Sequence, residues 1–197
     1  MEIYDISQEL FSSIVFPGDP TPKREELLKM EKGDVCNLTA VYMCVHNGTH
    51  IDAPYHFYKD GKTVEQIPLG KLVGYSYVAE HSGNITENDA RKILEKAKKA
   101  HIEAYKRILI KGDATVTYEA SLVFADANVD LLGNESQTVG PKDSPMAVHK
   151  VLLGKEIVLL EGIRLEKVPE GVYILSSAPI SLQGSDGSPC RAILIKV

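Results

Sequence analysis

Residues 46–57 read HNGTHIDAPYHF and place three histidines and one aspartate within a short stretch. His46 and His50 have the i, i+4 spacing of helical metal sites, but Asn47-Gly48 and Pro54 make a helix through this stretch costly. In an extended chain alternate side chains share a face, so positions 46, 50, 52 and 56 are expected to point to one side. Gly48 carries no side chain there and would leave room for an ion.

Three imidazoles and a carboxylate form a mixed nitrogen and oxygen donor set. Such a set suits Zn²⁺ or Mn²⁺ and does not suit Ca²⁺ or an iron-sulfur cluster. The alternative is that these are ordinary polar side chains on a half-exposed strand, which is the common case for a single histidine. Because burying several imidazoles and a carboxylate without a partner is unfavourable, the combination favours a metal site.

The rest of the chain is typical of one globular domain spanning residues 1–197. Apolar residues make up 44% and charged residues 25%, and no repeat or linker divides the 197 residues. The formal net charge is −5, and no cluster of lysine and arginine mixes with aromatic residues, so binding to nucleic acid is not expected. The chain also lacks an apolar run of membrane length, so no membrane association is expected.

The expected compartment is the cytoplasm. The first residues, MEIYDISQELFSS, include acidic side chains and do not resemble a secretory signal. The three cysteines are odd in number and have no CxxC spacing, which argues against a disulfide framework and a zinc ribbon. They are expected to stay reduced.

Local patterns predict two helices and several strands. Thr86 is expected to cap a helix that ends near Ala100 and buries Ile93, Leu94 and Ala97. A second helix is expected after Ser144 as N-cap and Pro145 as first residue, with Gly154 just past its end. Strands are predicted at 108–110, 121–124, 157–160, 172–175 and 192–195, and the FPGDP segment at 16–20 is predicted to be a turn or loop.

These elements predict an α/β or α+β domain with a mixed sheet. The pattern contains many short strands and only two clear helices, so it does not show a regular alternation of strand and helix.

The stretch at 46–57 resembles the H-x-G-T-H-x-D-A-P-x-H-F signature of the metal-dependent cyclase family, whose members include bacterial kynurenine formamidases. FPGDP near the start, HKVLLGKEIVLLEGI at 149–163 and GSDGSPCRAIL at 184–194 resemble further family segments in the same order. The resemblance therefore extends over nearly the whole chain. It implies a swivelling β/β/α fold, which would be a single α/β domain with a mixed sheet, and a homodimer or higher homo-oligomer.

The resemblance also implies a two-metal site. His46, His50 and Asp52 would bind one ion, and Asp52, His149 and Glu161 a second, with Glu161 also touching the first. Zn²⁺ is the expected metal and Mn²⁺ is possible, because the same donors bind both. Without the resemblance, His149 would be assigned to a helix and Glu161 to the end of a strand, each with a structural role.

The implied reaction is hydrolysis of an amide or formamide bond in a small molecule by metal-activated water. His56 corresponds to the family's acid/base residue, and an imidazole that titrates near neutrality suits that role. The expected substrate is N-formylkynurenine, which would yield kynurenine and formate. The alternatives are a hydrolase that opens a cyclic amide or related ring, and a module that binds metal or a small molecule without catalysis.

Two positions separate this chain from typical formamidases. Phe16 stands where those enzymes are expected to carry a substrate-contacting tryptophan, and the chain has no tryptophan. Phenylalanine can still stack on a ring, so Phe16 is the expected substrate-binding residue. Thr49 stands where typical formamidases tend to carry alanine.

Two further features are assigned no catalytic role. GSDGSPCRA is interpreted as a turn, which leaves Asp186 and Arg191 outside the expected site. A nucleophilic pair of Cys44 and His46 is disfavoured, because no third orienting group is identifiable and His46 is assigned to the metal.

Overall fold

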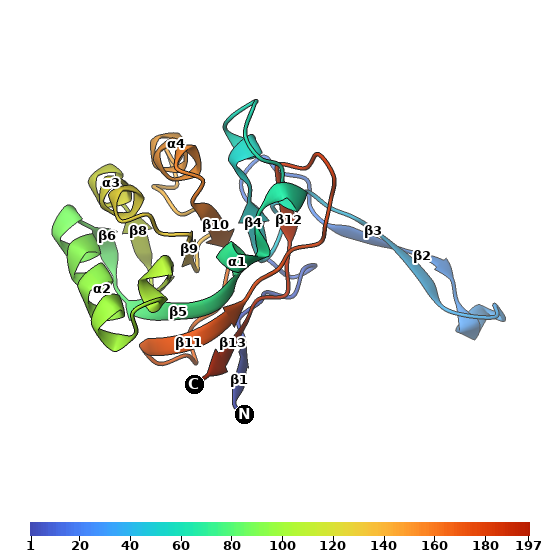
Figure 1. Ribbon diagram of the computed structural model, residues 1–197. Helices are drawn as coiled ribbons and strands as arrows, with labels where there is room; N and C mark the ends of the chain where they lie inside the picture. Colours follow the sequence, from blue (N-terminus) through green and yellow to red (C-terminus); the bar gives the residue numbers. More distant parts are fainter.

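The computed structural model describes residues 1–197, and its main element is a curled nine-stranded sheet (Figure 1). From one edge to the other, its strands are β1 (Ile3–Asp5), β13 (Ile193–Lys196), β11 (Gly171–Ser176), β5 (Val73–Glu80), β7 (Arg107–Lys111), β9 (Leu131–Asn134), β10 (Val158–Glu161), β4 (His50–Asp52) and β12 (Gly187–Pro189). The four strands from β5 to β10 are parallel, and the strands on either side pair antiparallel. The predicted mixed sheet is therefore confirmed.

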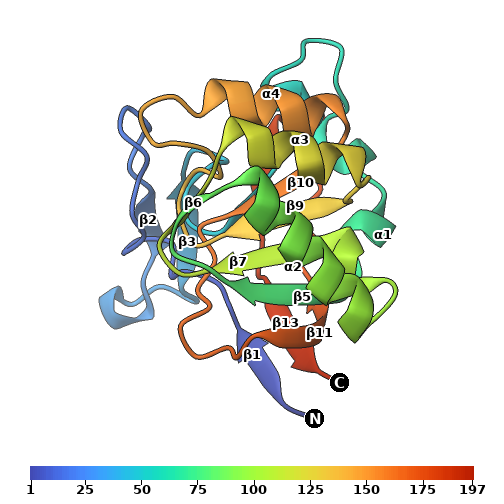
Figure 2. The ribbon, with the colours of Figure 1, turned by 90° about the vertical axis from the view of Figure 1, so that its left-hand side faces the viewer.

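Three helices cover one face of this sheet (Figure 2). They are α2 (Glu87–Ala100), α3 (Tyr118–Asp126) and α4 (Met146–Gly154), and each connects two of the parallel strands, which cannot be joined by a tight turn. Thr86 caps α2 as predicted, because its side chain accepts a hydrogen bond from the Asp89 N–H. A short helix, α1 (Leu69–Leu72), precedes β5.

The sheet is buried on both faces, and alternate residues of its strands enter two different cores. In β7, Ile108 and Ile110 pack against the helices, whereas Leu109 points to the opposite face. That second core also holds Ile51 from β4 and Leu194 from β13, which lie near opposite ends of the sheet. The sheet therefore curls so that its two ends meet on the face away from the helices. The domain thus has one layer of helices and two layers of strands.

The predicted strand at 121–124 is wrong, because these residues lie in α3. The Thr117 side chain accepts a hydrogen bond from the Ala120 N–H and so caps a helix. Ala120, Val123 and Phe124 are buried at the spacing of one helical face. A short apolar run does not distinguish a buried strand from a buried helix, so its periodicity was ambiguous.

This misassignment also hid the regular part of the fold. From β5 to β10 the main elements alternate as strand and helix, with two short paired strands, β6 (Gly83–Ile85) and β8 (Ala114–Val116), beside them. The domain is thus α/β and has four α-helices instead of the two that the sequence indicated.

The helix that carries His149 differs by one residue from its prediction at each end. It begins at Met146 with Pro145 as N-cap, and Gly154 is its last residue instead of following it. The other predicted strands, at 108–110, 157–160, 172–175 and 192–195, correspond to β7, β10, β11 and β13. The FPGDP segment forms a turn in which Gly18 has a φ of 102°.

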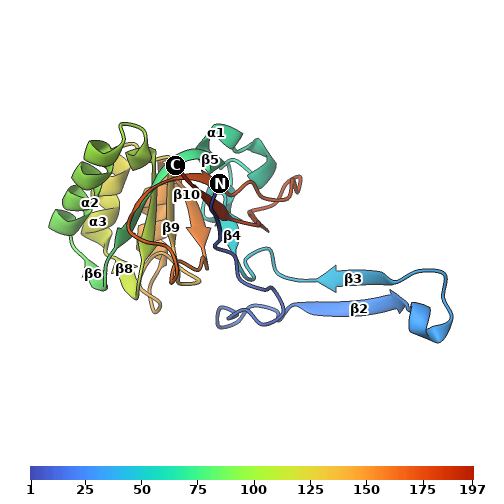
Figure 3. The same cartoon turned by 90° about the horizontal axis from the view of Figure 1, so that it is seen from below.

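A two-stranded hairpin projects from the body of the molecule (Figure 3). Its strands are β2 (Lys23–Leu28) and β3 (Leu38–Tyr42), which pair antiparallel with each other and with no strand of the main sheet. A 3₁₀ turn at Met30–Lys32 lies at its tip. We call residues 21–43 the arm.

Candidate metal centre

The centre of the site is β4, which lies between β10 and β12. Only residues 50–52 of the stretch at 46–57 are extended, so the prediction that the whole stretch is extended is wrong. His46 lies in a turn that Asn47 closes by donating its backbone N–H to the Cys44 carbonyl. His56 ends a 3₁₀ helix that begins at Pro54.

Gly48 has a different role from the one predicted. Its φ of 68° lies in the left-handed region, which glycine adopts without strain and which lets the chain pass from the turn into β4. A side chain added at Gly48 would contact Leu10 and Ser13, not the group of histidines.

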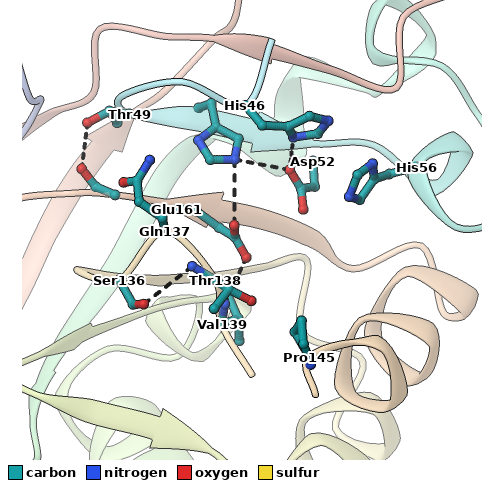
Figure 4. Close-up of polar contacts among 12 residues, drawn as sticks. His46, Thr49, Asp52, His56, Ser136, Gln137, Thr138, Val139, Pro145 and Glu161 are labelled. Carbon is teal, nitrogen blue, oxygen red and sulfur yellow. Dashed lines mark hydrogen bonds and ion pairs between the residues drawn. The ribbon is translucent and has the colours of Figure 1, made fainter. Parts of the chain in front are cut away.

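The tertiary structure nevertheless brings the predicted side chains together, and Figure 4 shows His46, Asp52, His56 and Glu161 among them. His50 lies directly opposite Glu161 in the pairing of β4 with β10. Asp52 lies two residues further along β4, so its side chain is on the same face of the strand as that of His50. Helix α4 places His149 beside them. His46, His50 and Asp52 form one group whose candidate donor atoms all lie within 4.8 Å of one another, and Asp52, His149 and Glu161 form a second.

The two carboxylates connect these groups. Asp52 Oδ1 lies 2.8 Å from His46 Nδ1 and 3.3 Å from His50 Nε2, while its Oδ2 lies 3.6 Å from His149 Nε2. Glu161 Oε1 lies 3.2 Å from His149 Nε2, and its Oε2 lies 3.5 Å from His50 Nε2. Each carboxylate therefore faces both groups. The Val139 N–H donates to Glu161 Oε1 at 2.8 Å and holds that side chain in place.

In each histidine of the donor groups, one ring nitrogen, the inner one, faces Asp52 or Glu161. The other, outer nitrogen faces a different oxygen acceptor. His46 Nε2 lies 2.8 Å from Asp186 Oδ2, His50 Nδ1 lies 3.1 Å from the Gly48 carbonyl, and His149 Nδ1 lies 2.9 Å from the Pro145 carbonyl. A carboxylate or carbonyl can only accept, so these nitrogens carry the hydrogen. Outer contacts of this kind orient metal-binding histidines in proteins.

This arrangement fits a bound cation. A neutral imidazole has one N–H, so the inner nitrogens of the three histidines direct lone pairs at carboxylate oxygens. A positive charge between them removes that repulsion. Donors about 2.1 Å from a tetrahedral ion lie roughly 3.4 Å from each other, close to the separations of 3.2–3.6 Å between the inner nitrogens of His50 and His149 and the carboxylates.

In the metal-free site, protons supply the positive charge. Burial opposes charging His46, but hydrogen bonds with Asp186 and Asp52 outweigh it and raise its pKa to about 11. Burial is likewise outweighed at His50 and His149, whose carboxylate neighbours raise each pKa to about 9. The pKa of Asp52 is lowered despite its burial by the histidines beside it.

Asp186, which the sequence analysis left outside the expected site, lies beside two of the histidines. Its Oδ2 lies 2.8 Å from His46 Nε2 and 3.0 Å from His56 Nδ1. Hydrogen bonds from His46 and then His56 hold the pKa of Asp186 well below its usual range, so it accepts from both rings. Although GSDGSP does contain a turn, the turn leads into β12, which pairs with β4 and presents Asp186 to the histidines.

His56 lies at the edge of the group, where solvent reaches it. Its side chain is 29% exposed, and its ring centroid lies 4.2 Å from that of His46. Because Asp186 accepts from Nδ1–H, the neutral ring carries its lone pair on Nε2. His56 is therefore oriented in one tautomer beside the donor groups.

Phe16 lies in a different part of the surface. It lines an open cavity of about 1280 Å³ at the carboxyl ends of β5, β7 and β9, together with Lys111, Gln137 and Arg164. None of the histidines or carboxylates of the two donor groups lines this cavity. The segment 137–139 connects the two regions, since Gln137 lines the cavity and Val139 contacts Glu161.

Neither Arg191 nor any of the cysteines is a member of the donor groups. All three cysteines are unpaired, and burial raises the pKa of Cys190 to about 12, so its thiol stays protonated. Arg191 forms an exposed ion pair with Asp5, which is consistent with leaving it out of the site.

Comparison with known proteins gives a consistent group of relatives. The Cyclase family model, described as "Putative cyclase", matches residues 4–144. The kynurenine formamidase of Bacillus anthracis is 32% identical, with 96% of this chain and 95% of that protein covered. The kynurenine formamidase of Erythrobacter litoralis is also 32% identical, with coverage of 98% and 93%.

Solved structures share the fold. A structure described as a potential metal-dependent hydrolase with cyclase activity has a TM-score of 0.80 and 28% identity, and covers 98% of this chain and 96% of its own. Isatin hydrolase A from Labrenzia aggregata has a TM-score of 0.81 at 22% identity, with coverage of 100% and 94%.

No helix of this chain combines the length and the apolar character needed to cross a membrane.

Proposed function

Since the chain belongs to the Cyclase family, we propose that it is a metal-dependent amidohydrolase that cleaves N-formylkynurenine to kynurenine and formate. The observation that carries this proposal is the convergence of three histidines and two carboxylates from β4, β10, α4 and the turn before β4, with His56 beside them. Full-length similarity to two kynurenine formamidases supports the substrate.

We propose that the donor set holds two divalent cations, with Zn²⁺ as the metal and Mn²⁺ as a substitute. His46 Nδ1, His50 Nε2 and Asp52 Oδ1 would hold one, and Asp52 Oδ2, His149 Nε2 and Glu161 Oε1 the other, with Glu161 Oε2 facing the first. When bound, such ions supply a water of lowered pKa and polarise a carbonyl oxygen.

His56 would move the proton of the reaction. Its Nε2 lone pair accepts a proton from the attacking water and then delivers it to the leaving nitrogen, which departs as a neutral amine. Asp186 maintains this tautomer by accepting from Nδ1–H, and it stabilises the imidazolium that forms between the two transfers. Partial exposure of the ring leaves it accessible to substrate.

Phe16 is proposed to contact the aromatic ring of the substrate. It lines the cavity that adjoins the site through Gln137 and Val139, and a phenyl ring stacks on an aniline ring without needing a hydrogen bond. We also propose a homo-oligomer, as the family resemblance implies, and a cytoplasmic location, which three unpaired cysteines support.

The test combines metal analysis of the purified protein with product analysis. The protein should contain a divalent cation and should convert N-formylkynurenine to equal amounts of kynurenine and formate, with loss of activity in a chelator and recovery with Zn²⁺ or Mn²⁺. A metal-loaded protein that leaves N-formylkynurenine intact would overturn the substrate assignment.

A ring-opening hydrolase is the second candidate. It is favoured by Phe16 in place of tryptophan and by Thr49, which stands where typical formamidases tend to carry alanine. The Thr49 hydroxyl donates to the Gly162 carbonyl at 2.7 Å. Ring opening of a cyclic amide releases no fragment, so mass analysis distinguishes it from formate release. Metal binding without turnover of either substrate class would instead identify a non-catalytic binding module.

A further inference from the structure

Arg164, in the cavity that Phe16 lines, has hydrogen-bond donors that the chain does not use. Its Nη1 donates to the backbone carbonyls of Glu135 and Ile163, at 3.1 and 2.8 Å. Its Nη2 donates to the side-chain carbonyl of Gln8. These acceptors are all neutral, and the N–H of Nε and one N–H of Nη2 have no partner. Free donors on adjacent guanidinium nitrogens are what a carboxylate accepts in a bidentate contact.

Glu135 holds a carboxylate in the same cavity. Its Oε2 accepts from the Gly112 N–H at 2.7 Å and its Oε1 from the Leu165 N–H at 2.8 Å, which fixes the group to the loops after β7 and β10. Each oxygen has a further lone pair that can accept another hydrogen bond. Arg164 and Glu135 are therefore neighbouring groups of opposite charge, and each is held by other partners instead of by an ion pair between them.

The cavity as a whole carries charges of both signs. Its cations are Lys111, Lys142 and Arg164, and its carboxylates are Glu80, Asp113, Glu135, Asp143 and Glu166. A lining with more carboxylates than cations repels a ligand that is only anionic, and it suits a ligand that bears both charges. An α-amino acid has a carboxylate and an ammonium group on one carbon, so it can contact two neighbouring groups of opposite charge at once.

Hydrogen bonds fix this charged pair relative to the donor groups. Gln8, which accepts from Arg164, donates to Gln137 Oε1 at 2.7 Å. Gln137 donates in turn to the Gly48 carbonyl at 3.1 Å, and that carbonyl also accepts from His50 Nδ1. One continuous set of hydrogen bonds therefore joins the cavity to the donor groups. A molecule that spans both is held in a defined orientation at each end.

We propose that Arg164 and Glu135 bind the α-amino acid group of the substrate, with Arg164 on the carboxylate and Glu135 on the ammonium group. This inference rests on the proposed function, because N-formylkynurenine carries an amino acid at the end of the side chain of its ring, away from the formamide. The formamide then lies at the donor groups, and the ring lies beside Phe16 in the same cavity. Arg164 and Glu135 thus determine specificity for aryl formamides that bear an amino acid.

The first test measures binding to the Zn²⁺-loaded protein by calorimetry. The probes are kynurenine, its analogue without the carboxylate and its analogue without the ammonium group. The wild type should bind kynurenine about 10–100-fold more tightly than either analogue, the effect of hydrogen bonds to a charged group. Arg164→Gln should abolish only the preference over the carboxylate-free analogue, and Glu135→Gln only the preference over the ammonium-free one. Each variant is compared with itself, so a partly unfolded preparation changes the stoichiometry and not the preference.

Lys142→Gln and Asp143→Asn are the matched controls. Each removes a charge of the same sign from the lining of the same cavity, and both side chains are exposed. Both variants should keep the wild-type preferences, because screened surface charges contribute little. A wild type without either preference would overturn the proposal. Equal losses in K142Q and R164Q would also overturn it, since the net charge of the cavity would then account for binding.

The second test separates this inference from the proposed function. Arg164→Gln should lower the ratio of kcat/KM for N-formylkynurenine to kcat/KM for N-formylaniline by about 10–100-fold, mainly through KM for N-formylkynurenine. If the variant hydrolyses N-formylkynurenine with the wild-type ratio, the inference fails and the proposed function stands. If kynurenine binding depends on Arg164 and Glu135 but N-formylkynurenine is not hydrolysed, the proposed function fails and the amino acid site stands.

Discussion

At the residue scale, Asp186 connects the donor groups to His56, the proposed acid/base residue. Both rings that Asp186 contacts donate to one carboxylate oxygen, so this side chain orients a proposed metal ligand and the proposed acid/base residue together. In the proposed mechanism, a single carboxylate therefore couples the geometry of metal binding to that of catalysis.

Replacing His56 with alanine is expected to lower kcat by about 10²–10⁴-fold, the usual contribution of general acid/base catalysis. His56 is not a member of the donor groups, which keep all five of their residues, so metal content should not change. Both are measured on the same preparation, kcat by product formation and metal by elemental analysis. His101→Ala is the control, since His101 stacks on Tyr75 outside the site. Unchanged turnover in the His56 variant would exclude it from the mechanism.

Asp186→Asn is expected to reduce activity and metal affinity by about 10–100-fold each, the usual effect of losing an orienting outer contact. Asparagine keeps the shape of the side chain but offers one acceptor oxygen and a competing donor to two N–H groups. Metal affinity is measured by competition with a chelating dye. Asp126→Asn, at the exposed end of α3, should match the wild type. Wild-type metal affinity in D186N would show that Asp186 does not orient His46.

At the element scale, short segments from distant parts of the chain hold the site. The strand β4 supplies His50 and Asp52, and its neighbours β10 and β12 bring Glu161 and Asp186 to it. The Tyr58 hydroxyl donates to the Lys150 carbonyl at 2.7 Å, which ties the segment after His56 to the helix that carries His149.

Tyr58→Phe removes the hydrogen bond between the Tyr58 hydroxyl and the Lys150 carbonyl. A net hydrogen bond is worth about 1 kcal/mol, and less at a partly exposed position, so kcat should fall by at most about fivefold. The expected cause is a less well-positioned His56, so kcat should change more than KM and metal content should stay constant. A tenfold or larger loss of bound metal would show instead that the hydrogen bond from Tyr58 to Lys150 positions His149.

Thr86→Ala is expected to destabilise the fold by about 1 kcal/mol, because the variant loses the N-cap of α2. The helix packs on the face of the sheet away from the second core, and the capping residue contacts none of the donor groups. Urea unfolding should therefore show the loss while kcat stays at the wild-type value. Thr86→Ser keeps the capping hydroxyl and should restore most of the stability.

At the scale of the whole molecule, the donor groups contribute to the pH dependence of folding. In the metal-free chain, the pKa of His46 is raised to about 11 and those of His50 and His149 to about 9, from an ordinary value of 6.5. The stabilisation from charging these rings is complete below pH 6.5 and is lost as pH rises through the raised values.

Chelator-treated protein should therefore become less stable between pH 7 and pH 9.5. Metal replaces the protons, so the metal-loaded protein should show a flatter profile and a higher Tm throughout this range. Thermal unfolding in matched buffers measures both. A metal-free Tm that rises toward pH 9.5 would contradict the assignment of charge within the site.

The sequence allowed parts of the fold to be predicted because their signals are local. Thr86 followed by acidic residues and a lysine-rich end identified α2, and apolar runs identified β7, β10, β11 and β13. The run at 121–124 was misassigned, because three consecutive apolar residues after Ser121 fit a buried strand and a buried helix equally well. The turn at Gly48 was missed, since Asn-Gly indicates a turn but not where the turn directs its neighbours.

The sequence by itself determined the chemical types at the candidate site and the family signature in which they occur. Only the tertiary structure decided which of them meet. Asp186 lies 140 residues from His46 and 130 from His56, and nothing in a local turn motif specifies contact over such a separation. The pairing of β4 with β10 and β12 creates that contact. Hydrogen bonding between the strands fixes their register, and the register brings side chains from the three segments close together.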